Sequence, residues 1–388
     1  MKNKENCIVV INNIEGGVFT FSKNIAIHNK NPNLIFTFLV IKKKNQLINL
    51  ELIEDLNFII FEYNDFNNFF FTAKKLNKIF SNYSIIIAND GLELKVTWFN
   101  KIKPKIIFIL HGCYDYYISQ AITYQQIIDK FICVNPEISE ILNISLPDRS
   151  SEIKYIPVPT KDPKYSPIAS NQTITLIFVG RLSKEKGILI LPQIDKILKT
   201  FGVIVNWIVI GQLELDNESE LINWLNGSEN VNYLGFLTNN SVSEYYKKAD
   251  ILILPSLAEG FPVVVAESMK YGVIPIINDL PGFNKMLKNS KARLIPGNDV
   301  NKYVEQIIEL VNDEQELNNS KENILDFSKK YFSLNLNVEK FIQELLNIKQ
   351  DKLNVQFKEQ MFHSRLDRKY FPNFLVRKIR EIKSKYFL

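Results

Sequence analysis

The sequence predicts an α/β protein with two Rossmann-like domains in tandem. Short apolar runs recur along the chain, each followed by a longer amphipathic stretch. Apolar strands that alternate with helices indicate parallel sheets covered on both faces. This alternation stops at a proline-rich segment, residues 156–172, and then starts again. The length of 388 residues is enough for two domains of ordinary size.

The predicted elements follow in order along each half. In the first half, the expected strands are CIVVINNI, NLIFTFLVI, NFIIFE, YSIIIAND, KIIFILHG and KFICVN. In the second half, they are ITLIFVG, VNWIVIG, NVNYLG, ADILILP, GVIPIIND and KARLIP. We therefore expect domains at 1–160 and 161–350, followed by a basic amphipathic extension at 351–388. Ligands of such sheets bind outside the carboxyl ends of the strands, so we expect a site in a cleft between the two sheets.

Composition excludes several classes of protein. The net charge is +5, and residues 365–388 alone contribute +6 from eight basic and two acidic side chains. The rest of the chain is therefore close to neutral, which argues against a nucleic-acid-binding protein. Three scattered cysteines form neither a disulfide framework nor a zinc site, which is typical of a reducing compartment. No apolar run reaches the roughly 20 residues that span a bilayer, so we expect a cytoplasmic protein.

The stretch PSLAEGFPVVVAESMKYG carries two carboxylates, Glu259 and Glu267, around a loop that enters a helix near Pro262. Free N–H groups at such a helix start favour an anionic or polyhydroxyl ligand. Carboxylates also accept hydrogen bonds from sugar hydroxyls and from a ribose diol. The alternative is an ordinary acidic helix start.

A second motif, IFVGRLSKEKG, places Arg181 and Lys186 in one loop directly after a strand that ends at Gly180. Glycine permits close approach of the backbone, and two cations can clamp a diphosphate. The motif has neither the spacing of a P-loop nor the full dinucleotide-binding glycine pattern. A solvated basic turn is the alternative.

Two weaker signals lie in the first half. Gly16 and Gly17 follow the first strand and can bring backbone N–H groups near a phosphate, although a plain tight turn explains them too. His111 ends the strand KIIFIL, where α/β ligands bind, although a lone histidine is more often structural. The sequence contains no Asp-x-Asp, no His/Cys cluster with metal-ligand spacing and no Gly-x-Ser-x-Gly. A metal-centred phosphate site and a serine hydrolase are therefore not expected.

Together these motifs resemble a retaining GT-B glycosyltransferase of family 4, the glycosyl transferases group 1. The likeness runs through GRLSKEKG, VNYLGFL and ADILILPSLAEGFPVVVAESMKYG in the family's order, and more loosely through EGG, LHG and FICVNPEISEIL in the first half. Three segments depart from the family's usual pattern. IPVPTKDP replaces a typical sequence before the linker, GQLE replaces a second G-x-G, and PGFNKM carries Lys285 where an acid is common.

The resemblance implies that residues 1–160 form the acceptor-binding domain and residues 161–350 the nucleotide-sugar donor-binding domain. It also implies a role for each site residue. Arg181 and Lys186 would hold the donor diphosphate, Glu259 would contact the transferred sugar, and Glu267 would bind the ribose. His111 would lie beside the anomeric carbon, making His111, Glu259, Arg181 and Lys186 the catalytic set. The remaining donor-binding positions would be Gly16 and Gly17 near the phosphates, Gly235, Phe236 and Leu237 beside the base, and the backbone of Gly260, Phe261, Pro262 and Val263.

The expected activity is transfer of a hexose from a nucleotide sugar, with UDP favoured, to a glycan or lipid-linked acceptor of bacterial surface polysaccharide. The resemblance implies neither a cofactor nor a metal. It also implies front-face attack, in which the departing phosphate helps to remove the acceptor proton. A sugar-nucleotide epimerase on the same architecture and a non-catalytic sugar-nucleotide or glycan-binding subunit are the alternatives.

The basic tail, residues 364–388, offers two interpretations. Its apolar and basic positions separate on a helical wheel, which is typical of a segment that rests on an anionic membrane surface. That would make the protein peripheral on the inner face of the plasma membrane. The alternative is a final helix that packs back on the first domain.

Overall fold

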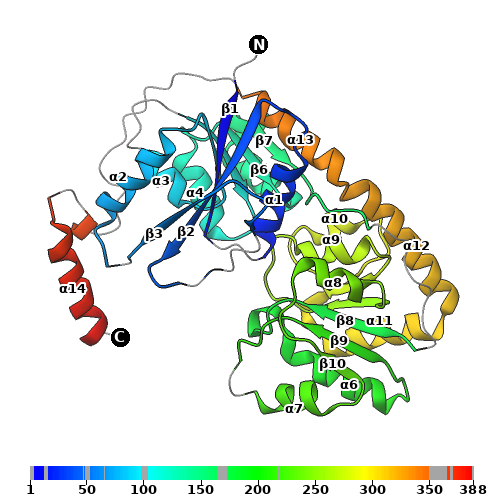
Figure 1. Ribbon diagram of the computed structural model, residues 1–388. Coiled ribbons are helices and arrows are strands. Elements are labelled where there is room, and N and C mark those ends of the chain that lie inside the picture. Colours follow the sequence, from blue (N-terminus) through cyan, green and yellow to red (C-terminus); the bar gives the residue numbers. More distant parts are fainter. Residues whose placement is uncertain are drawn as a thin grey trace. The chain divides into compact units, whose positions relative to one another are not determined.

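The fold is a pair of α/β units (Figure 1). The computed structural model describes residues 4–12, 16–46, 48, 53–64, 66–97, 104–163, 173–215, 218–348, 365–367 and 370–386. Contacts group Met1–Val134, Ile138–Ile156 and Val338–Leu388 in the first unit, and Asn135–Glu137 with Pro157–Asn337 in the second.

The first unit contains one parallel sheet. Its described strands follow the order β3-β2-β1-β4-β5-β6-β7. Their bounds are β1 Glu5–Ile11, β2 Leu34–Lys43, β3 Phe58–Tyr63, β4 Ile85–Ala88, β5 Lys105–Leu110, β6 Lys130–Cys133 and β7 Ile153–Tyr155. Cys7 of β1 pairs with Phe36 of β2 on one side and with Ile85 of β4 on the other, so β1 is an interior strand of the sheet.

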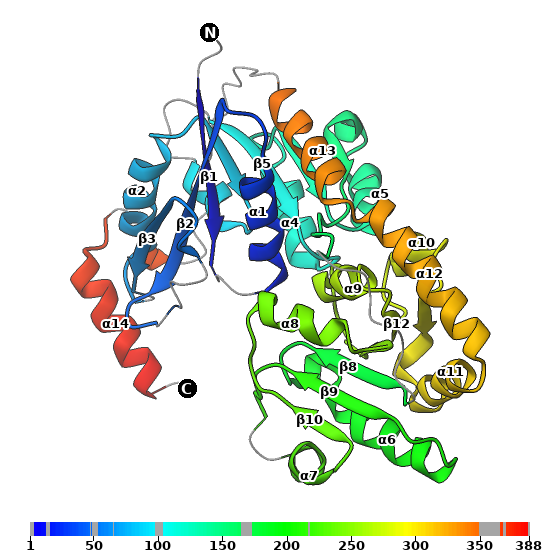
Figure 2. The same ribbon diagram turned by 45° about the vertical axis from the view of Figure 1, so that its right-hand side comes forward.

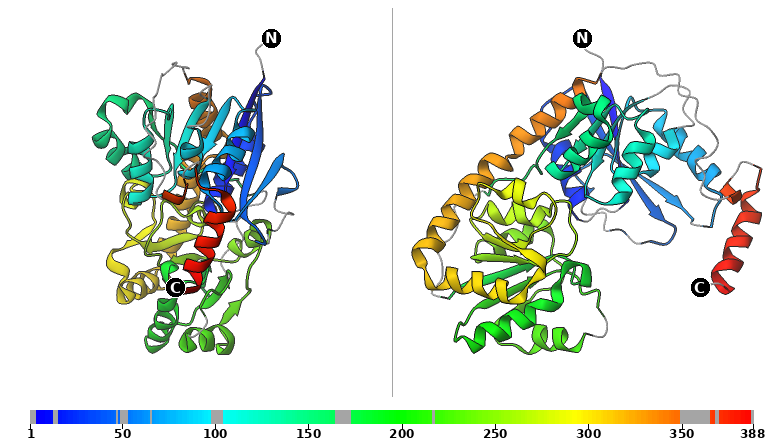
Figure 3. Two further views of the ribbon diagram at one scale, coloured as in Figure 1. Left: turned by 90° about the vertical axis from the view of Figure 1, so that its left-hand side faces the viewer. Right: turned by 180° about the vertical axis from the view of Figure 1, so that it is seen from behind.

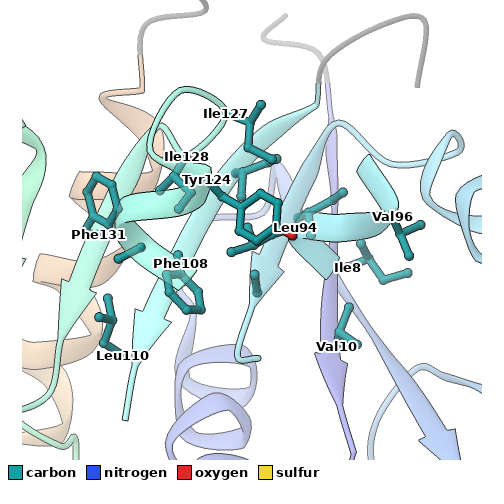
Figure 4. Close-up of a cluster of buried hydrophobic side chains, with 14 of the residues drawn as sticks. Ile8, Val10, Leu94, Val96, Phe108, Leu110, Tyr124, Ile127, Ile128 and Phe131 are labelled. Atoms are coloured by element: carbon teal, nitrogen blue, oxygen red, sulfur yellow. The ribbon is translucent and has the colours of Figure 1, made fainter. Parts of the chain in front are cut away.

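Helices cover both faces of this sheet (Figure 2). They are α1 Gly17–His28, α2 Phe69–Phe80, α3 Leu92–Thr97, α4 Asp115–Tyr124, α5 Pro136–Ser145 and α13 Leu334–Leu346. The last helix of this unit, α14 Asn373–Tyr386, lies at the outer edge of the sheet. On one face, Ile8 and Val10 of β1 join a core with Leu94 and Tyr124 from the helices (Figure 4). Successive strand residues point to opposite faces, so Cys7 and Val9, which alternate with Ile8 and Val10, are buried on the other face of the sheet.

The second unit repeats this plan with the described strand order β10-β9-β8-β11-β12-β13, again all parallel. The strands are β8 Thr175–Val179, β9 Asn206–Ile210, β10 Val231–Tyr233, β11 Ile251–Leu254, β12 Ile274–Asn278 and β13 Arg293–Ile295. The helices are α6 Leu191–Thr200, α7 Ser219–Gly227, α8 Asn239–Tyr246, α9 Val263–Met269, α10 Phe283–Leu287, α11 Val300–Asn312 and α12 Glu314–Tyr331.

The two Rossmann-like units confirm the predicted fold class, and every strand expected from the sequence is present. Strand β7 was not expected, because its three residues are too few to give a periodic pattern. Residues 164–172 of the proposed linker lie outside the described residues. The contact-based boundaries differ from the predicted ones at 160 and 350, because the chain rejoins the first unit at Val338.

The later turns of α13 explain that return. Phe341 is fully buried and meets Phe21 of α1 edge to face, with ring centroids 6.3 Å apart. Glu344 pairs with Lys130 of β6 at 2.9 Å. The helix therefore belongs partly to the first sheet's covering layer, and the C-terminal segment follows it into the same unit.

Candidate active site

In the second unit, the predicted site residues gather at the carboxyl edge of the sheet. Gly180 follows β8, Gly211 follows β9 and Gly235 lies just beyond β10. The Gly180 N–H donates to Ile210 O at 3.0 Å, and the Gly211 N–H donates to Gly235 O at 2.8 Å. A Cβ atom on Gly211 would lie 1.7 Å from the Gly180 carbonyl oxygen, so only glycine allows this approach. Parallel strands bring these loops to one edge, where α/β ligands bind.

The Arg181–Lys186 loop contacts the loop that follows β11. The Leu257 N–H donates to Glu185 O at 2.8 Å. Gly187 adopts φ +68°, and a Cβ atom there would lie 2.0 Å from the Pro255 carbonyl oxygen. The structure therefore joins two motifs that the sequence analysis treated separately.

Lys186 and Glu259 complete this junction. The Lys186 ammonium donates to a Glu259 carboxylate oxygen, and the two side chains are only 19% and 12% exposed. A shielded ion pair of this kind is held in place more firmly than a surface pair. The ammonium has three N–H donors, so it can bind an anion while it keeps its bond to Glu259.

Arg181 lies nearer the solvent. Its side chain is 56% exposed and forms ion pairs with Glu214 at 3.2 Å and with Glu185 at 3.7 Å. Exposed pairs of this kind contribute little to stability, at most about 1 kcal/mol. The guanidinium can therefore exchange these partners for an anionic ligand at small cost.

Two residues that the sequence analysis missed fix the loop after β11. Asn278, at the end of β12, donates from Nδ2 to the backbone oxygens of Pro255 and Ser256 at 3.2 and 2.9 Å. The Tyr303 hydroxyl donates to Asn278 Oδ1 at 3.0 Å. Both side chains are buried, so this network holds the loop from beneath. In the sequence, the only signal for this network was the polar Asn278 at the end of the apolar run GVIPIIND.

The segment Gly260–Val263 leads into α9. Phe261 is buried, stacks on Phe332 with ring centroids 5.1 Å apart and meets Phe283 edge to face at 5.8 Å. Its ring therefore anchors the loop, which leaves only its backbone for a ligand. Pro262 is the residue before the helix, which starts at Val263, one residue later than expected from the sequence.

Glu267 lies within α9 in a largely apolar setting. Burial raises the pKa of this carboxyl from its ordinary 4.5 to about 7. The hydroxyl of Tyr246, at the end of α8, is buried without a hydrogen-bond partner among the described residues, and its pKa is raised by burial and by the nearby Glu267. The Glu267 carboxyl and the Tyr246 hydroxyl are therefore polar groups that can form hydrogen bonds with a ligand.

Three further predicted residues follow β10. Gly235 adopts φ +64°, a conformation that favours glycine. Phe236 is 49% exposed, and Leu237 is partly buried. An exposed aromatic ring at the carboxyl edge of a sheet offers a surface for stacking a planar ligand.

The first unit holds the other predicted residues at the carboxyl edge of its own sheet. Gly16 precedes α1 with φ +89°, and a Cβ atom there would meet nothing within 4 Å. Backbone conformation, and not crowding, therefore favours glycine at this position. Gly17 begins the helix.

His111 follows β5 and is held in one orientation. Its Nε2 lies 2.8 Å from Asn89 Oδ1. The amide nitrogen of Asn89 donates to Val10 O at 3.0 Å and to Ser22 Oγ at 3.3 Å, so its oxygen faces the histidine. Burial lowers the pKa of His111 to about 3, so the ring is neutral at neutral pH. Nε2 then carries the proton, and Nδ1 is the hydrogen-bond acceptor.

Glu93 supports this arrangement and was not singled out from the sequence. Its Oε1 accepts the backbone N–H groups of Asn89 at 3.0 Å and Asp90 at 3.3 Å. Burial, and then the charge of Asp90, raise the pKa of Glu93 to about 8. It therefore positions the loop that holds His111.

The predicted residues thus form two groups, one in each unit. Arg181, Lys186, Glu259, Glu267 and their glycine-rich loops lie in the second unit, whereas Gly16, Gly17 and His111 lie in the first. Across the described positions, no three His, Cys, Asp or Glu side chains are arranged to hold a metal ion. None of the described helices has the length and apolarity needed to cross a membrane.

Comparison with known proteins finds a family that the second unit resembles. Residues 161–326 match the family described as Glycosyl transferases group 1. This range contains the whole second-unit group of site residues. The similarity to group 1 glycosyltransferases therefore covers most of the second unit and its candidate site.

Relatives in sequence include an uncharacterized glycosyltransferase of Methanocaldococcus jannaschii. It is 26% identical over 342 residues, which cover 84% of this chain and 88% of that protein. Another is the UDP-Gal:alpha-D-GlcNAc-diphosphoundecaprenol alpha-1,3-galactosyltransferase of Escherichia coli, 26% identical over 48% of this chain and 49% of its own length. The chain thus spans most of the first relative and about half of the second.

A solved structure, Anabaena HepE in complex with UDP and glucose, shares the fold. Its TM-score is 0.69 at 14% identity, over 88% of this chain and 99% of that one. Such a likeness shows architecture alone. With two parallel-sheet Rossmann-like units, the fold is GT-B.

Proposed function

We propose that this protein is a retaining, metal-independent glycosyltransferase of family 4. It moves a sugar from a UDP-sugar to a glycan or lipid-linked acceptor. The observation that carries the proposal is the junction of Lys186 and Glu259, with Arg181 on the same loop, at the carboxyl edge of a group 1 domain. The nucleotide in the HepE structure and the donor named for the Escherichia coli relative support the choice of UDP.

In the donor site, Arg181 and Lys186 bind the diphosphate. Glu259 accepts hydrogen bonds from hydroxyls of the transferred sugar, and its bond to Lys186 keeps the two groups side by side. Glu267 accepts from the ribose, and residues Gly235–Leu237 border the base. The backbone of Gly260–Val263 approaches the sugar and phosphate.

Charge stabilisation is the main catalytic effect in this scheme. The bond that breaks joins the anomeric carbon to the β-phosphate oxygen, and negative charge develops on the leaving nucleoside diphosphate. Lys186, fixed by its ion pair, stabilises that charge without reorganisation, and Arg181 stabilises it after exchanging its carboxylate partners for the diphosphate. Such an effect is often worth about 2–4 kcal/mol for each donor. The absence of an Asp-x-Asp from the sequence supports metal independence.

In the first unit, Gly16 and Gly17 approach the phosphates. His111 lies beside the anomeric carbon, where its neutral Nδ1 accepts a hydrogen bond from a sugar hydroxyl. A neutral ring avoids placing positive charge beside a centre that itself becomes positive. The acceptor attacks from the leaving-group face, and its proton passes to the departing phosphate.

The setting we propose is the assembly of bacterial surface polysaccharide at the inner face of the plasma membrane. The lipid-linked substrate named for the Escherichia coli relative supports this. The basic C-terminal segment would supply a peripheral contact with anionic lipid. No nucleic-acid partner is part of the proposal.

The test is donor hydrolysis with a panel of nucleotide sugars, compared between wild type and Lys186→Ala. Loss of the ammonium should slow turnover by about 2–4 kcal/mol, or roughly 30- to 1,000-fold. Arg181→Ala should slow it in the same direction. Lys184→Ala is the matched control, because Lys184 lies in the same loop but is 68% exposed and pairs with Glu218. If both variants at 181 and 186 hydrolyse the donor like the control, the diphosphate site is wrong.

A further inference from the structure

The first unit contains a cavity that none of the site residues above lines. Its volume is about 390 Å³, within the usual range of small-ligand sites, roughly 300–1,000 Å³. Strands β2 and β3, helices α2 and α3, and the start of α4 contribute to its walls. Two residues of the C-terminal segment, Asp367 and Arg380, complete it.

The C-terminal wall is fixed by hydrogen bonds to the loop before α2. The Phe69 N–H donates to Asp367 Oδ1 at 2.8 Å, and Arg380 donates to Asn67 O at 2.6 Å. Asn68 donates from Nδ2 to Phe371 O at 2.8 Å. Views from two further sides show α14 at the outer edge of the sheet (Figure 3). The segment is therefore a built part of the cavity.

The lining combines aromatic rings with amide and hydroxyl groups. The rings belong to Phe61, Tyr63, Phe69 and Tyr116, and the polar groups to Asn64, Asn67 and Thr72. Aromatic faces pack on the C–H faces of sugar rings, whereas amides and hydroxyls exchange hydrogen bonds with sugar hydroxyls. Ile41, Leu76 and Leu92 add aliphatic surface to the lining. The combination suits a saccharide, which presents both C–H faces and hydroxyl groups.

The charges in the cavity favour a neutral sugar over a phosphate. Arg380 makes a two-point ion pair with Asp367, at 2.9 and 3.0 Å. Lys95 lies near Asp90, whose charge acts on its ammonium. Each cation among the described lining residues thus has a carboxylate to balance it, so these residues offer no surplus positive charge to an anion.

The cavity adjoins the His111 group. Tyr116 lines it and donates from its hydroxyl to Asp90 Oδ1 at 2.6 Å. Asp90 follows Asn89, the residue that holds His111. The side chain of Tyr116 would therefore separate a ligand in the cavity from the loop that holds His111.

From these observations, we propose that the cavity binds a neutral saccharide unit of the acceptor, and that the C-terminal segment supplies one of its walls. This rests on the proposed function in one respect, the identification of the sugar as acceptor. In this proposal, Asp367 and Arg380 of the C-terminal segment help to select the acceptor sugar. This role does not depend on contact with a membrane.

The test is saturation-transfer NMR on the full chain with the methyl glycosides of glucose, galactose, N-acetylglucosamine and N-acetylgalactosamine. At least one glycoside should bind the wild type. Thr72→Trp fills the cavity and should abolish that signal. Thr200→Trp, on an exposed turn of the second unit, is the matched control and should retain it. Thermal unfolding checks that each variant is folded.

Tyr116→Ala provides a second measurement if Thr72→Trp does not fold, because Tyr116 is already 46% exposed. Loss of its ring should weaken binding about three- to tenfold. No binding of any glycoside by the wild type, or equal binding by wild type and both cavity variants, would overturn the proposal. UDP is titrated into the same samples. If UDP binds and glycosides do not, the cavity proposal fails alone, whereas the reverse result removes the donor site and leaves the cavity.

Discussion

Lys186 and Glu259 are 73 positions apart in the sequence and meet in one shielded ion pair. Each limits what the other can do. The carboxylate reduces the positive potential that a diphosphate would meet, while the ammonium holds the carboxylate in one orientation. Substitution of either residue therefore changes two functions, and the direction of each change can be predicted.

Glu259→Ala should lower turnover far more than it weakens binding of UDP. Removal of the carboxylate takes away contacts with the transferred sugar but leaves Lys186 without its ion-pair partner and open to the diphosphate. We expect UDP affinity to stay the same or to rise, as measured by isothermal titration. A parallel loss of UDP binding and turnover would contradict the separate roles.

Glu267→Ala should show the reverse pattern. Glu267 belongs to α9, and we propose that its carboxyl accepts a hydrogen bond from the ribose. Because the variant lacks this carboxyl, its free energy of nucleotide binding should weaken by about 1–3 kcal/mol. Turnover at saturating donor should change less. The measurement is UDP titration beside donor hydrolysis. Unchanged UDP affinity would remove Glu267 from the nucleotide site.

The raised pKa of Glu267 also predicts a pH dependence of stability. Between pH 4.5 and about 7, the folded protein keeps a proton that the unfolded chain has released. Stability therefore falls as pH rises through this window, by at most about 3 kcal/mol, and the cost stays constant above it. Glu267→Gln should raise Tm relative to wild type at pH 8 but not at pH 4. Glu322→Gln, at an exposed position, is the control, and an equal Tm shift in both variants would contradict the explanation.

Among the elements, α14 has a separate face for each of the two roles considered for the tail. Val376 is fully buried, and Arg380 is bound to Asp367 and Asn67, so one side of the helix packs on the first unit. The other side exposes Phe374 and Ile382, which are 75% and 48% accessible. Packing and membrane contact are therefore compatible.

We expect the full chain to sediment with anionic liposomes and the double variant Phe374→Ser with Ile382→Ser to sediment much less. Each buried aromatic or aliphatic side chain and each nearby basic residue adds about 1 kcal/mol or more to such binding. Since neither position faces the first unit, Tm should not change. Ile144→Ser, which removes an equally exposed apolar side chain elsewhere, should bind like wild type. Equal sedimentation of all three proteins would exclude a membrane role for this face.

For the whole molecule, the proposed mechanism predicts that activity persists in EDTA. Arg181 and Lys186 supply the charge that a divalent cation would otherwise supply at the diphosphate. The rate of donor hydrolysis with chelator should match the rate without it. Complete loss in EDTA that magnesium or manganese restores would contradict metal independence.

Much of the fold could be predicted from the sequence, because buried parallel strands need continuous apolar runs. Runs such as ITLIFV and ADILIL have this character and became β8 and β11. Strand β7 has only three residues, of which only Ile153 is buried, so it gives no continuous apolar run. No change of composition marks Val338, where α13 begins to pack on the first unit.

The site residues could be named from motifs, but their contacts could not. That Gly187 fits against Pro255, or that Asn278 and Tyr303 hold the same loop, depends on packing between segments that no local pattern connects. The pKa values of Glu93 and Glu267 likewise follow from burial, which is a property of the folded chain. Spacing in the sequence therefore identifies candidate chemistry, while geometry decides which groups act together.

The discontinuous first unit has a consequence for how the protein is made. The second unit occupies one unbroken stretch, Pro157–Asn337, apart from three residues, whereas the first needs Val338 onward to cover its sheet. A ribosome releases the chain at about 5–20 residues per second, and domains generally fold as units. The N-terminal part of the first unit is synthesised first, but it cannot complete its fold until α13 and α14 cover the surface beneath Phe341 and Arg380. The second unit is synthesised later and can complete its fold earlier. The two units therefore complete their folds in the opposite order to that in which their synthesis begins. A chain whose synthesis is arrested before α13 would leave the first sheet partly uncovered and prone to aggregation.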